Sequence, residues 1–246
     1  MGPLLRSETH KMTTIRAPWL VLGAAVALQA AASVLLVLGG TALSEGLRHD
    51  AAAQRMLLDP GDLAIFALVL GALVATTDHR HDTIVPTLLA TPRRLQVVGA
   101  KAVVTAGLGL LTALAVGGTA VTLGLGLLAL DGASLALGAG EVAEGWARAA
   151  TVMVAYALLG LGIGELLRNQ VAAIVVPLVA LAVLAPLAQF AMPDAHWFLP
   201  TGLEQILLER QAGAPIGAAL AAGLLAAYAA GAVIAGGAVM ARRDVV

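Results

Sequence analysis

The chain has 246 residues, of which 60% are hydrophobic and 12% charged, and its formal net charge is -1. With a mean hydropathy of +0.93, this composition excludes a soluble globular domain and indicates an integral membrane protein. The sequence contains no cysteine, which excludes disulfides and cysteine-based metal or redox chemistry.

Long apolar stretches follow one another along the chain. About 20 apolar residues in a helix cross the hydrocarbon core of a bilayer. We predict six transmembrane helices, at residues 18–40, 62–77, 102–130, 146–166, 171–191 and 214–240. The fourth and fifth are separated only by the polar stretch ELLRNQ, and no hydrophilic stretch is long enough for a soluble domain. Residues 1–246 are therefore predicted to form a single all-α transmembrane domain.

The charges outside these stretches predict the orientation. With six spans, both termini lie on the same side as the connections at 78–101 and 167–170. The basic residues on that side are Arg6, Lys11, Arg16, Arg80, Arg93, Arg94, Lys101, Arg168, Arg242 and Arg243. The other side has only Arg48, Arg55, Arg148 and Arg210, together with ten acidic residues. Because Lys and Arg accumulate in cytoplasmic loops, both termini are predicted to be cytoplasmic.

The middles of the six stretches lack Asp, Glu, Lys, Arg and His. Ion-driven transporters usually bind their ion near the midplane, and a membrane-embedded enzyme needs an acid, a base or a metal ligand. Both classes are therefore disfavoured. The small residues of Gly160-x-x-x-Gly164 allow close helix approach, and we interpret them as packing within the chain rather than as a dimer motif.

The connection between the second and third spans, DHRHDTIVPTLLATPRRLQVVGAK, is polar and contains two prolines. Thr83 can cap a short helix, Pro86 fits into its first turn, and Pro92 ends it. The apolar face of this helix comprises Ile84, Val85, Leu88 and Leu89, and its polar face comprises Thr83, Thr87 and Thr91. Two interpretations remain open on physical grounds: a helix lying on lipid, or an element that docks onto a protein. His79 and His81 are interpreted as part of a solvated connection rather than as a metal site.

This connection resembles the corresponding segment of type-2 ABC exporter permeases, the membrane subunits of ATP-binding-cassette transporters. The family pattern is an acidic residue, an aromatic, Arg, His, Gly, Thr and Ile, then a short helix, TP, Arg and a Lys that opens the third span. Here it reads Asp78, His79, Arg80, His81, Asp82, Thr83 and Ile84, then LLATPRR and Lys101. The chain departs from the pattern at Asp78, where the family usually has Glu, at His79, where it has an aromatic, and at Asp82, where it has Gly.

The resemblance extends along the chain. SETHKMTTIRAPWLVL is similar to the family's N-terminal interfacial helix, with Glu8, Lys11 and Arg16 at matching positions. GLGIGELLRNQVAAIVVPL is similar to its fourth-to-fifth connection, and the C-terminal RRD to the end of its sixth span. After Pro200, Thr201 and Glu204 fit a T-x-x-E capping box, which predicts a short outer helix over about 201–210 before the sixth span.

The resemblance implies a permease subunit of an exporter in a bacterial plasma membrane that performs no covalent chemistry. A second copy or a homologous permease would complete the pathway for an amphipathic or hydrophobic substrate, and no nucleic acid would be involved. No stretch matches G-x-x-x-x-G-K-[ST], so this chain is predicted to bind no cofactor, and ATP and Mg would be bound by a partner ABC ATPase subunit.

By the same resemblance, the short helix between the second and third spans would be the coupling helix that docks into the ATPase. The residues expected to couple are Asp78, Arg80, Thr83, Ile84, Thr87, Leu88, Leu89, Pro92 and Arg93. Two alternatives stay open: a gradient-driven secondary transporter or channel, and a membrane scaffold that binds a cytoplasmic protein without transport.

Overall fold

The computed structural model describes residues 2–38, 50–80, 94–130, 132–210 and 213–242. Within these ranges the chain is helical with short connections and contains no strand. Six helical stretches are long and apolar enough to cross a membrane: Arg16–Val37, Ala51–Thr77, Gln96–Leu130, Ala139–Leu167, Gln170–Ala191 and Ala218–Met240. The predicted all-α membrane fold with six spans is confirmed.

The spans are built from the following elements, preceded by α1 (Gly2–Thr14). They are α2 (Arg16–Leu38); α4 (Ala51–Leu58), η1 (Gly61–Leu63) and α5 (Ala64–Arg80); α7 (Arg94–Leu130); α8 (Ala139–Leu167); α9 (Gln170–Val179), η2 (Ala180–Leu184) and α10 (Ala185–Ala191); and α12 (Ala218–Arg242). Between α10 and α12 lie η3 (His196–Phe198) and α11 (Pro200–Leu207).

The second, third and fourth spans begin earlier than predicted, and the second begins at Ala51, with α4, instead of at 62. Helix α7 starts at Arg94 and α8 at Ala139, whereas the apolar stretches start at 102 and 146. Hydropathy detects only the apolar part of a helix. The additional turns carry Lys101, Glu141 and Glu144, and each of these side chains forms an ion pair, which allows the helix to continue past the apolar stretch.

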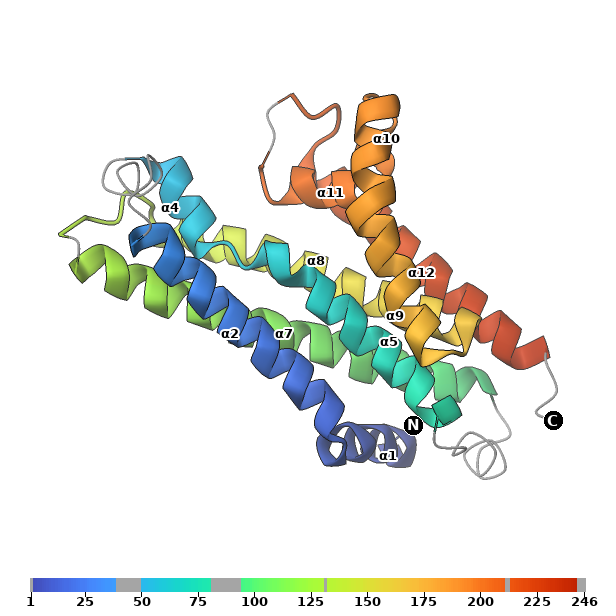
Figure 1. Ribbon diagram of the computed structural model, residues 1–246. Helices are drawn as coiled ribbons and strands as arrows, with labels where there is room; N and C mark the ends of the chain where they lie inside the picture. Colours follow the sequence, from blue (N-terminus) through green and yellow to red (C-terminus); the bar gives the residue numbers. More distant parts are fainter. Residues whose placement is uncertain (1, 39–49, 81–93, 131, 211–212, 243–246) are drawn as a thin grey trace.

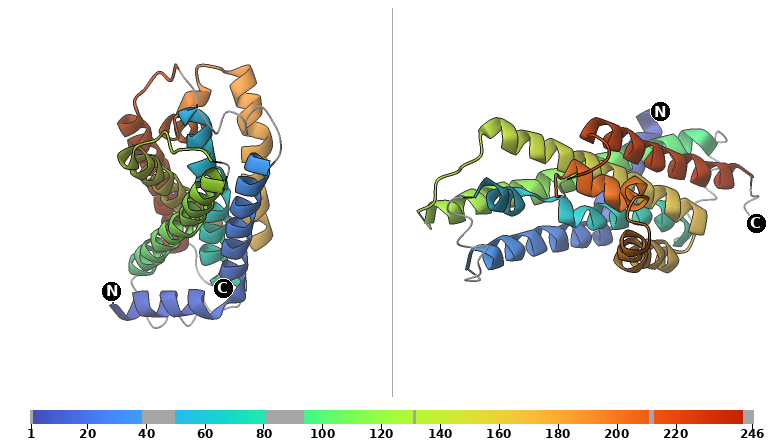
Figure 2. Two further views of the ribbon diagram at one scale, coloured as in Figure 1. Left: turned by 90° about the vertical axis from the view of Figure 1, so that its left-hand side faces the viewer. Right: turned by 90° about the horizontal axis from the view of Figure 1, so that it is seen from above.

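The second and fourth spans form the centre of the bundle (Figures 1 and 2). Within the most apolar window of each span, 72% of the residues of the second span and 67% of those of the fourth are buried. In the fifth span only 11% are buried. Helices α5 and α8 meet closely at glycines. A Cβ on Gly160 would lie 1.9 Å from the Leu68 carbonyl oxygen, and one on Gly71 would lie 1.8 Å from that of Ala157. The small residues around Gly160 thus pack within the chain, as predicted.

The connection between the fourth and fifth spans is a tight turn. Arg168 adopts a left-handed conformation (φ 52°) and ends α8, while the Asn169 side chain accepts a hydrogen bond from the Ala172 N–H and begins α9. This matches the predicted break at ELLRNQ. Within the fifth span, Pro177 lacks an N–H to donate, and a π-helical turn, η2, follows it.

Helix α1 runs across one end of the bundle instead of along it (Figures 1 and 2). That end, called here the α1 end, also contains the last turns of α5, α8 and α12 and the first turn of α7. Helices α4 and α11 and the first turn of α8 lie toward the opposite end. The predicted helix before the first span is therefore present, and both termini lie near the α1 end.

Candidate functional site at the α1 end

The predicted coupling segment begins and ends at the α1 end. Asp78 and Arg80 are in the last turn of α5, and α7 begins at Arg94. Thr83, Ile84, Thr87, Leu88, Leu89, Pro92 and Arg93 lie outside the described residues. The structure therefore leaves the predicted short helix untested, but it defines the helices that flank it and what holds them.

A buried ion pair joins α7 to α8 directly beside this segment. The Lys101 Nζ lies 2.8 Å from the Glu165 Oε1, and the two side chains are 0% and 2% exposed. In a poorly hydrated environment, removing one member of such a pair costs about 3–5 kcal/mol, because the other charge stays buried. The first turns of α7 are thus fixed to the last turn of α8.

Helices α5 and α12 pack around the same pair. A Cβ on Gly236 of α12 would lie 2.8 Å from the Glu165 Cβ, and one on Gly164 would lie 2.5 Å from the Ala75 Cβ of α5. Four helices therefore meet at this place with little free space, and a displacement of α7 would be transmitted to the others.

The interfacial helix α1 belongs to the same assembly. Met12 is 4% exposed and packs with Val74 and Ala75 of α5 and Leu161 of α8. Glu8, which was predicted as part of a helix on the membrane surface, is buried at 2% exposure and accepts a hydrogen bond from the Lys11 Nζ at 2.7 Å. Arg16 is exposed and begins α2. Helix α1 is thus packed against the bundle through Met12, with Glu8 also buried and Arg6 exposed.

At the opposite end the structure contradicts one prediction. Thr201 does not cap α11: the helix begins at Pro200, the preceding N-cap residue is Leu199, and no side chain caps it. The proline supplies a φ suited to the first helical position and has no N–H to satisfy, which moves the start of the helix before Thr201. Helix α11 also ends at Leu207, earlier than the predicted 210.

Glu204 has a different partner from the one predicted. Its carboxylate accepts a hydrogen bond of 2.5 Å from the Tyr156 hydroxyl of α8 and lies 3.9 Å from the Arg210 guanidinium. Burial raises the pKa of Glu204 to about 7, and the nearby Asp62 and Asp59 act in the same direction, against the effects of Tyr156 and Arg210. Glu204 therefore connects α11 to the central helix α8.

Exposed ion pairs surround this contact. Arg210 pairs with Asp59 at 2.7 Å and with Asp62. Further pairs join α4, α8 and the residues after α11: Arg55 with Glu141 and Glu209, and Arg148 with Glu144 and Glu209. Among the described residues no group of three or more His, Cys, Asp or Glu is arranged to hold a metal ion, and His81 lies outside them.

Sequence reasoning missed the Lys101–Glu165 pair. Both residues stand out as single charges at the ends of apolar stretches, and their signs are opposite, but their separation of 64 positions gave no reason to pair them. No protein-family model matches the chain, and no curated protein is significantly similar to it. The function proposed below therefore rests on the residues of the chain and their arrangement.

Proposed function

We propose that this chain is the permease subunit of an ATP-binding-cassette exporter and is driven by a separate ATPase subunit. The main support is the arrangement at the α1 end. The segment that resembles a coupling helix connects α5 to α7 in the sequence, and α7 is joined to α8 by the buried Lys101–Glu165 pair. A force applied to this segment would reach the centre of the bundle without being absorbed by a loose contact.

In this proposal the α1 end faces the cytoplasm. Ten of the fourteen Lys and Arg residues belong to the termini and to the connections on that side, as expected for cytoplasmic segments. The energy source is a partner that binds ATP and Mg, because the sequence contains no P-loop motif. The pathway forms with a second permease copy or a homologous permease.

The substrate is proposed to be amphipathic or hydrophobic. The spans offer hydroxyl groups, such as those of Thr112 and Thr119, but these donate hydrogen bonds to carbonyl oxygens of their own helix. A surface of this kind suits a cargo with much apolar area and few charges. The plasma membrane of a bacterium is the proposed location.

The proposal is tested by purifying the tagged chain from its own cells in mild detergent and identifying the proteins that accompany it. We expect a stoichiometric soluble protein that carries a P-loop. Leu88→Asp should reduce its recovery about tenfold or more, because a charge would enter the centre of the contact. Leu135→Asp is the matched control, since Leu135 is exposed in the connection between α7 and α8 at the opposite end.

Three results would contradict the proposal. Recovery of the chain without any ATPase, even after crosslinking, would favour a gradient-driven transporter. A partner that binds without nucleotide-dependent flux in reconstituted vesicles would favour a scaffold. Full ATPase recovery and full transport with Leu88→Asp would show that the segment is not the coupling element.

A further inference from the structure

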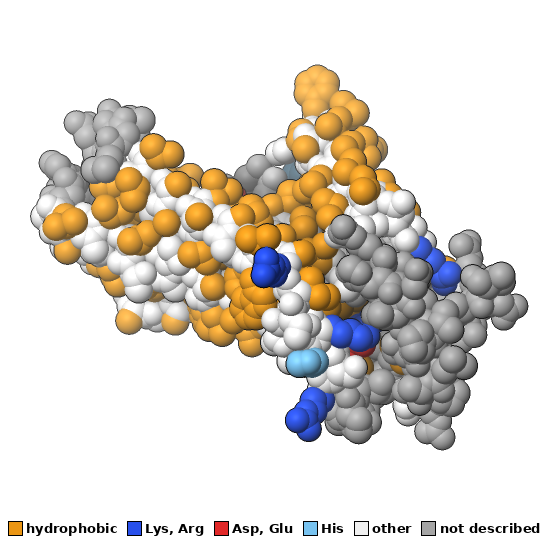
Figure 3. All heavy atoms as spheres, turned by 60° about the horizontal axis from the view of Figure 1, so that its bottom comes forward, with side chains coloured by type: hydrophobic (Ala, Val, Ile, Leu, Met, Phe, Trp, Pro, Cys, Tyr) orange, Lys and Arg blue, Asp and Glu red, His pale blue; other side chains and the backbone are white. Residues whose placement is uncertain are grey.

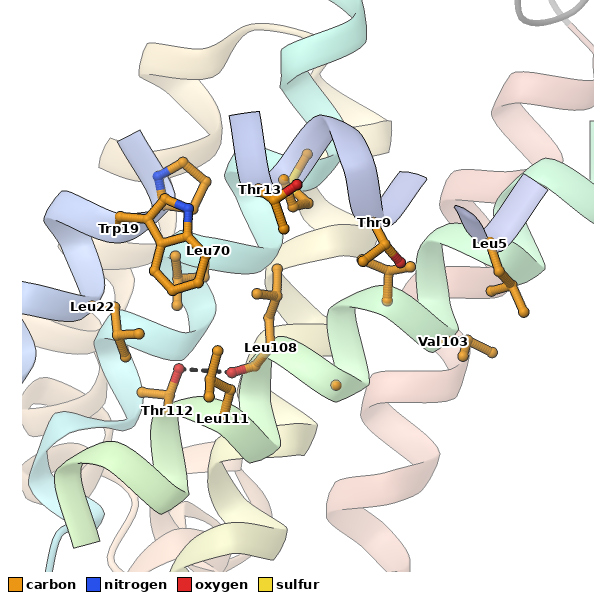
Figure 4. A pocket seen from close by; sticks show the side chains of 14 residues that line it. Leu5, Thr9, Thr13, Trp19, Leu22, Leu70, Val103, Leu108, Leu111 and Thr112 are labelled. Carbon is orange, nitrogen blue, oxygen red and sulfur yellow. Dashed lines mark hydrogen bonds between the residues drawn. The ribbon is translucent and has the colours of Figure 1, made fainter. Parts of the chain in front are cut away.

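A hollow opens between α1 and the spans beside it. Its volume is about 410 Å³, within the range of about 300–1,000 Å³ typical of small-molecule sites. Figure 4 shows Leu5 and Thr9 of α1, Trp19 and Leu22 of α2, and Leu108 of α7 around it. Helix α1 forms one wall, so the hollow exists only because this helix crosses the end of the bundle.

The lining is suited to a hydrocarbon chain. Most of the lining side chains are apolar, and two of its hydroxyls are already used. Thr13 donates to the His10 carbonyl oxygen at 2.9 Å, and Thr112 donates to that of Leu108 at 2.8 Å (Figure 4). A polar ligand would lose its hydration there without gaining these partners.

Two exposed arginines stand close in sequence to lining residues of the hollow. Arg6 follows Leu5, and Arg16 is two residues before Pro18. The one acidic residue of α1, Glu8, is buried against Lys11. Figure 3, turned so that the α1 side comes forward, shows Lys and Arg side chains, a His and an acidic side chain beside a largely hydrophobic face. Exposed positive charge on the residues next to the lining would favour a negatively charged group near an apolar hollow.

We propose that this hollow binds an anionic phospholipid, with one acyl chain between α1, α2 and α7 and the headgroup at Arg6 and Arg16. A helix that lies across the ends of the spans is at the depth of lipid headgroups, and a tryptophan such as Trp19 is typical of that depth. A bound lipid would hold α1 against the bundle. The inference does not depend on the proposed transport function.

Quenching of Trp19 fluorescence tests the proposal. The full chain is reconstituted in phosphatidylcholine vesicles containing either phosphatidylglycerol or phosphatidylcholine with brominated acyl chains, which quench tryptophan on contact. The contribution of Trp19 is the difference between the wild type and Trp19→Phe, so the other two tryptophans, Trp146 and Trp197, are left in place. We expect half-maximal quenching at about a tenfold lower fraction of brominated phosphatidylglycerol than of brominated phosphatidylcholine.

Two sets of variants separate the hollow from the general bilayer. Gly107 lines the hollow, and a Cβ there would meet no atom within 4 Å, so Gly107→Leu should fill it and abolish the preference. Gly118→Leu is the matched control, because Gly118 is equally open on the same helix but does not line the hollow. Replacing Arg6 and Arg16 by Gln should make the two brominated lipids quench Trp19 equally well.

Equal quenching by both lipids in the wild type would overturn the headgroup assignment. A preference that survives Gly107→Leu would overturn the placement of the chain in the hollow, since Trp19 would then be reporting lipid at the outer surface. Thermal unfolding of each variant in the same vesicles shows whether it is folded, and Gly107→Ala, which adds a single carbon, provides a milder filling variant if Gly107→Leu does not fold.

Discussion

The two ends of the bundle use charged residues in different ways. At the α1 end the Lys101–Glu165 pair is almost completely buried, and it joins residues 64 positions apart in sequence. At the opposite end the pairs are numerous and solvated: Arg55, Glu141 and Glu209 are each 50% exposed. A buried pair is costly to break because either charge alone stays in a poorly hydrated place, whereas an exposed charge is taken up by water. The buried pair at the α1 end is therefore expected to tolerate substitution less well than the exposed pairs at the opposite end.

The largest expected effect comes from breaking the buried pair. Glu165→Gln should lower the free energy of unfolding by about 3–5 kcal/mol, because Lys101 would lose its carboxylate partner while still buried. Thermal unfolding in mild detergent measures the change. The double variant Lys101→Met, Glu165→Leu should recover most of the stability, since it removes both charges. A double variant as unstable as Glu165→Gln would show that the loss of stability does not come from the broken ion pair.

A smaller effect is expected from the titration of Glu204. Its pKa is about 7 in the folded protein and about 4.3 in an unfolded chain. The folded state thus binds the Glu204 proton more tightly than the unfolded chain does. This proton binding stabilises the folded protein below about pH 4.3, and the stabilisation is lost as the pH rises to 7. We expect the free energy of unfolding to fall by about 1–3 kcal/mol over this interval.

Unfolding at pH 5 and pH 8 measures this dependence, and Glu204→Gln provides the comparison. Glutamine does not titrate and still accepts the Tyr156 hydrogen bond through its amide oxygen. The variant should therefore be much less sensitive to pH than the wild type. An equally strong dependence in Glu204→Gln would assign the titration to another group.

The smallest effect is expected in the exposed network. Arg148→Gln removes pairs with Glu144 and Glu209, whose side chains are 63% and 50% exposed. The free energy of unfolding should fall by about 1 kcal/mol or less, and the difference should shrink further in high salt. A loss as large as that of Glu165→Gln would remove the distinction between the two ends.

Local features of the sequence predicted the elements well. The six spans follow from apolar length, the turn at Arg168–Asn169 follows from a polar interruption, and the helix ahead of the first span is present as α1. The capping box at Thr201 was wrong because Pro200 competes for the same helix start. The coupling residues from Thr83 to Arg93 remain a prediction.

The sequence by itself determined that this is a six-span helical membrane protein, because bilayer thickness imposes a length and an apolar content that each span must meet alone. Only the tertiary structure decided which charges meet. Lys101 and Glu165 are 64 positions apart and Tyr156 and Glu204 are 48 apart, and each pair depends on how the helices pack. The hollow beneath α1 likewise comes from packing, since its lining is drawn from four helices that share no local pattern.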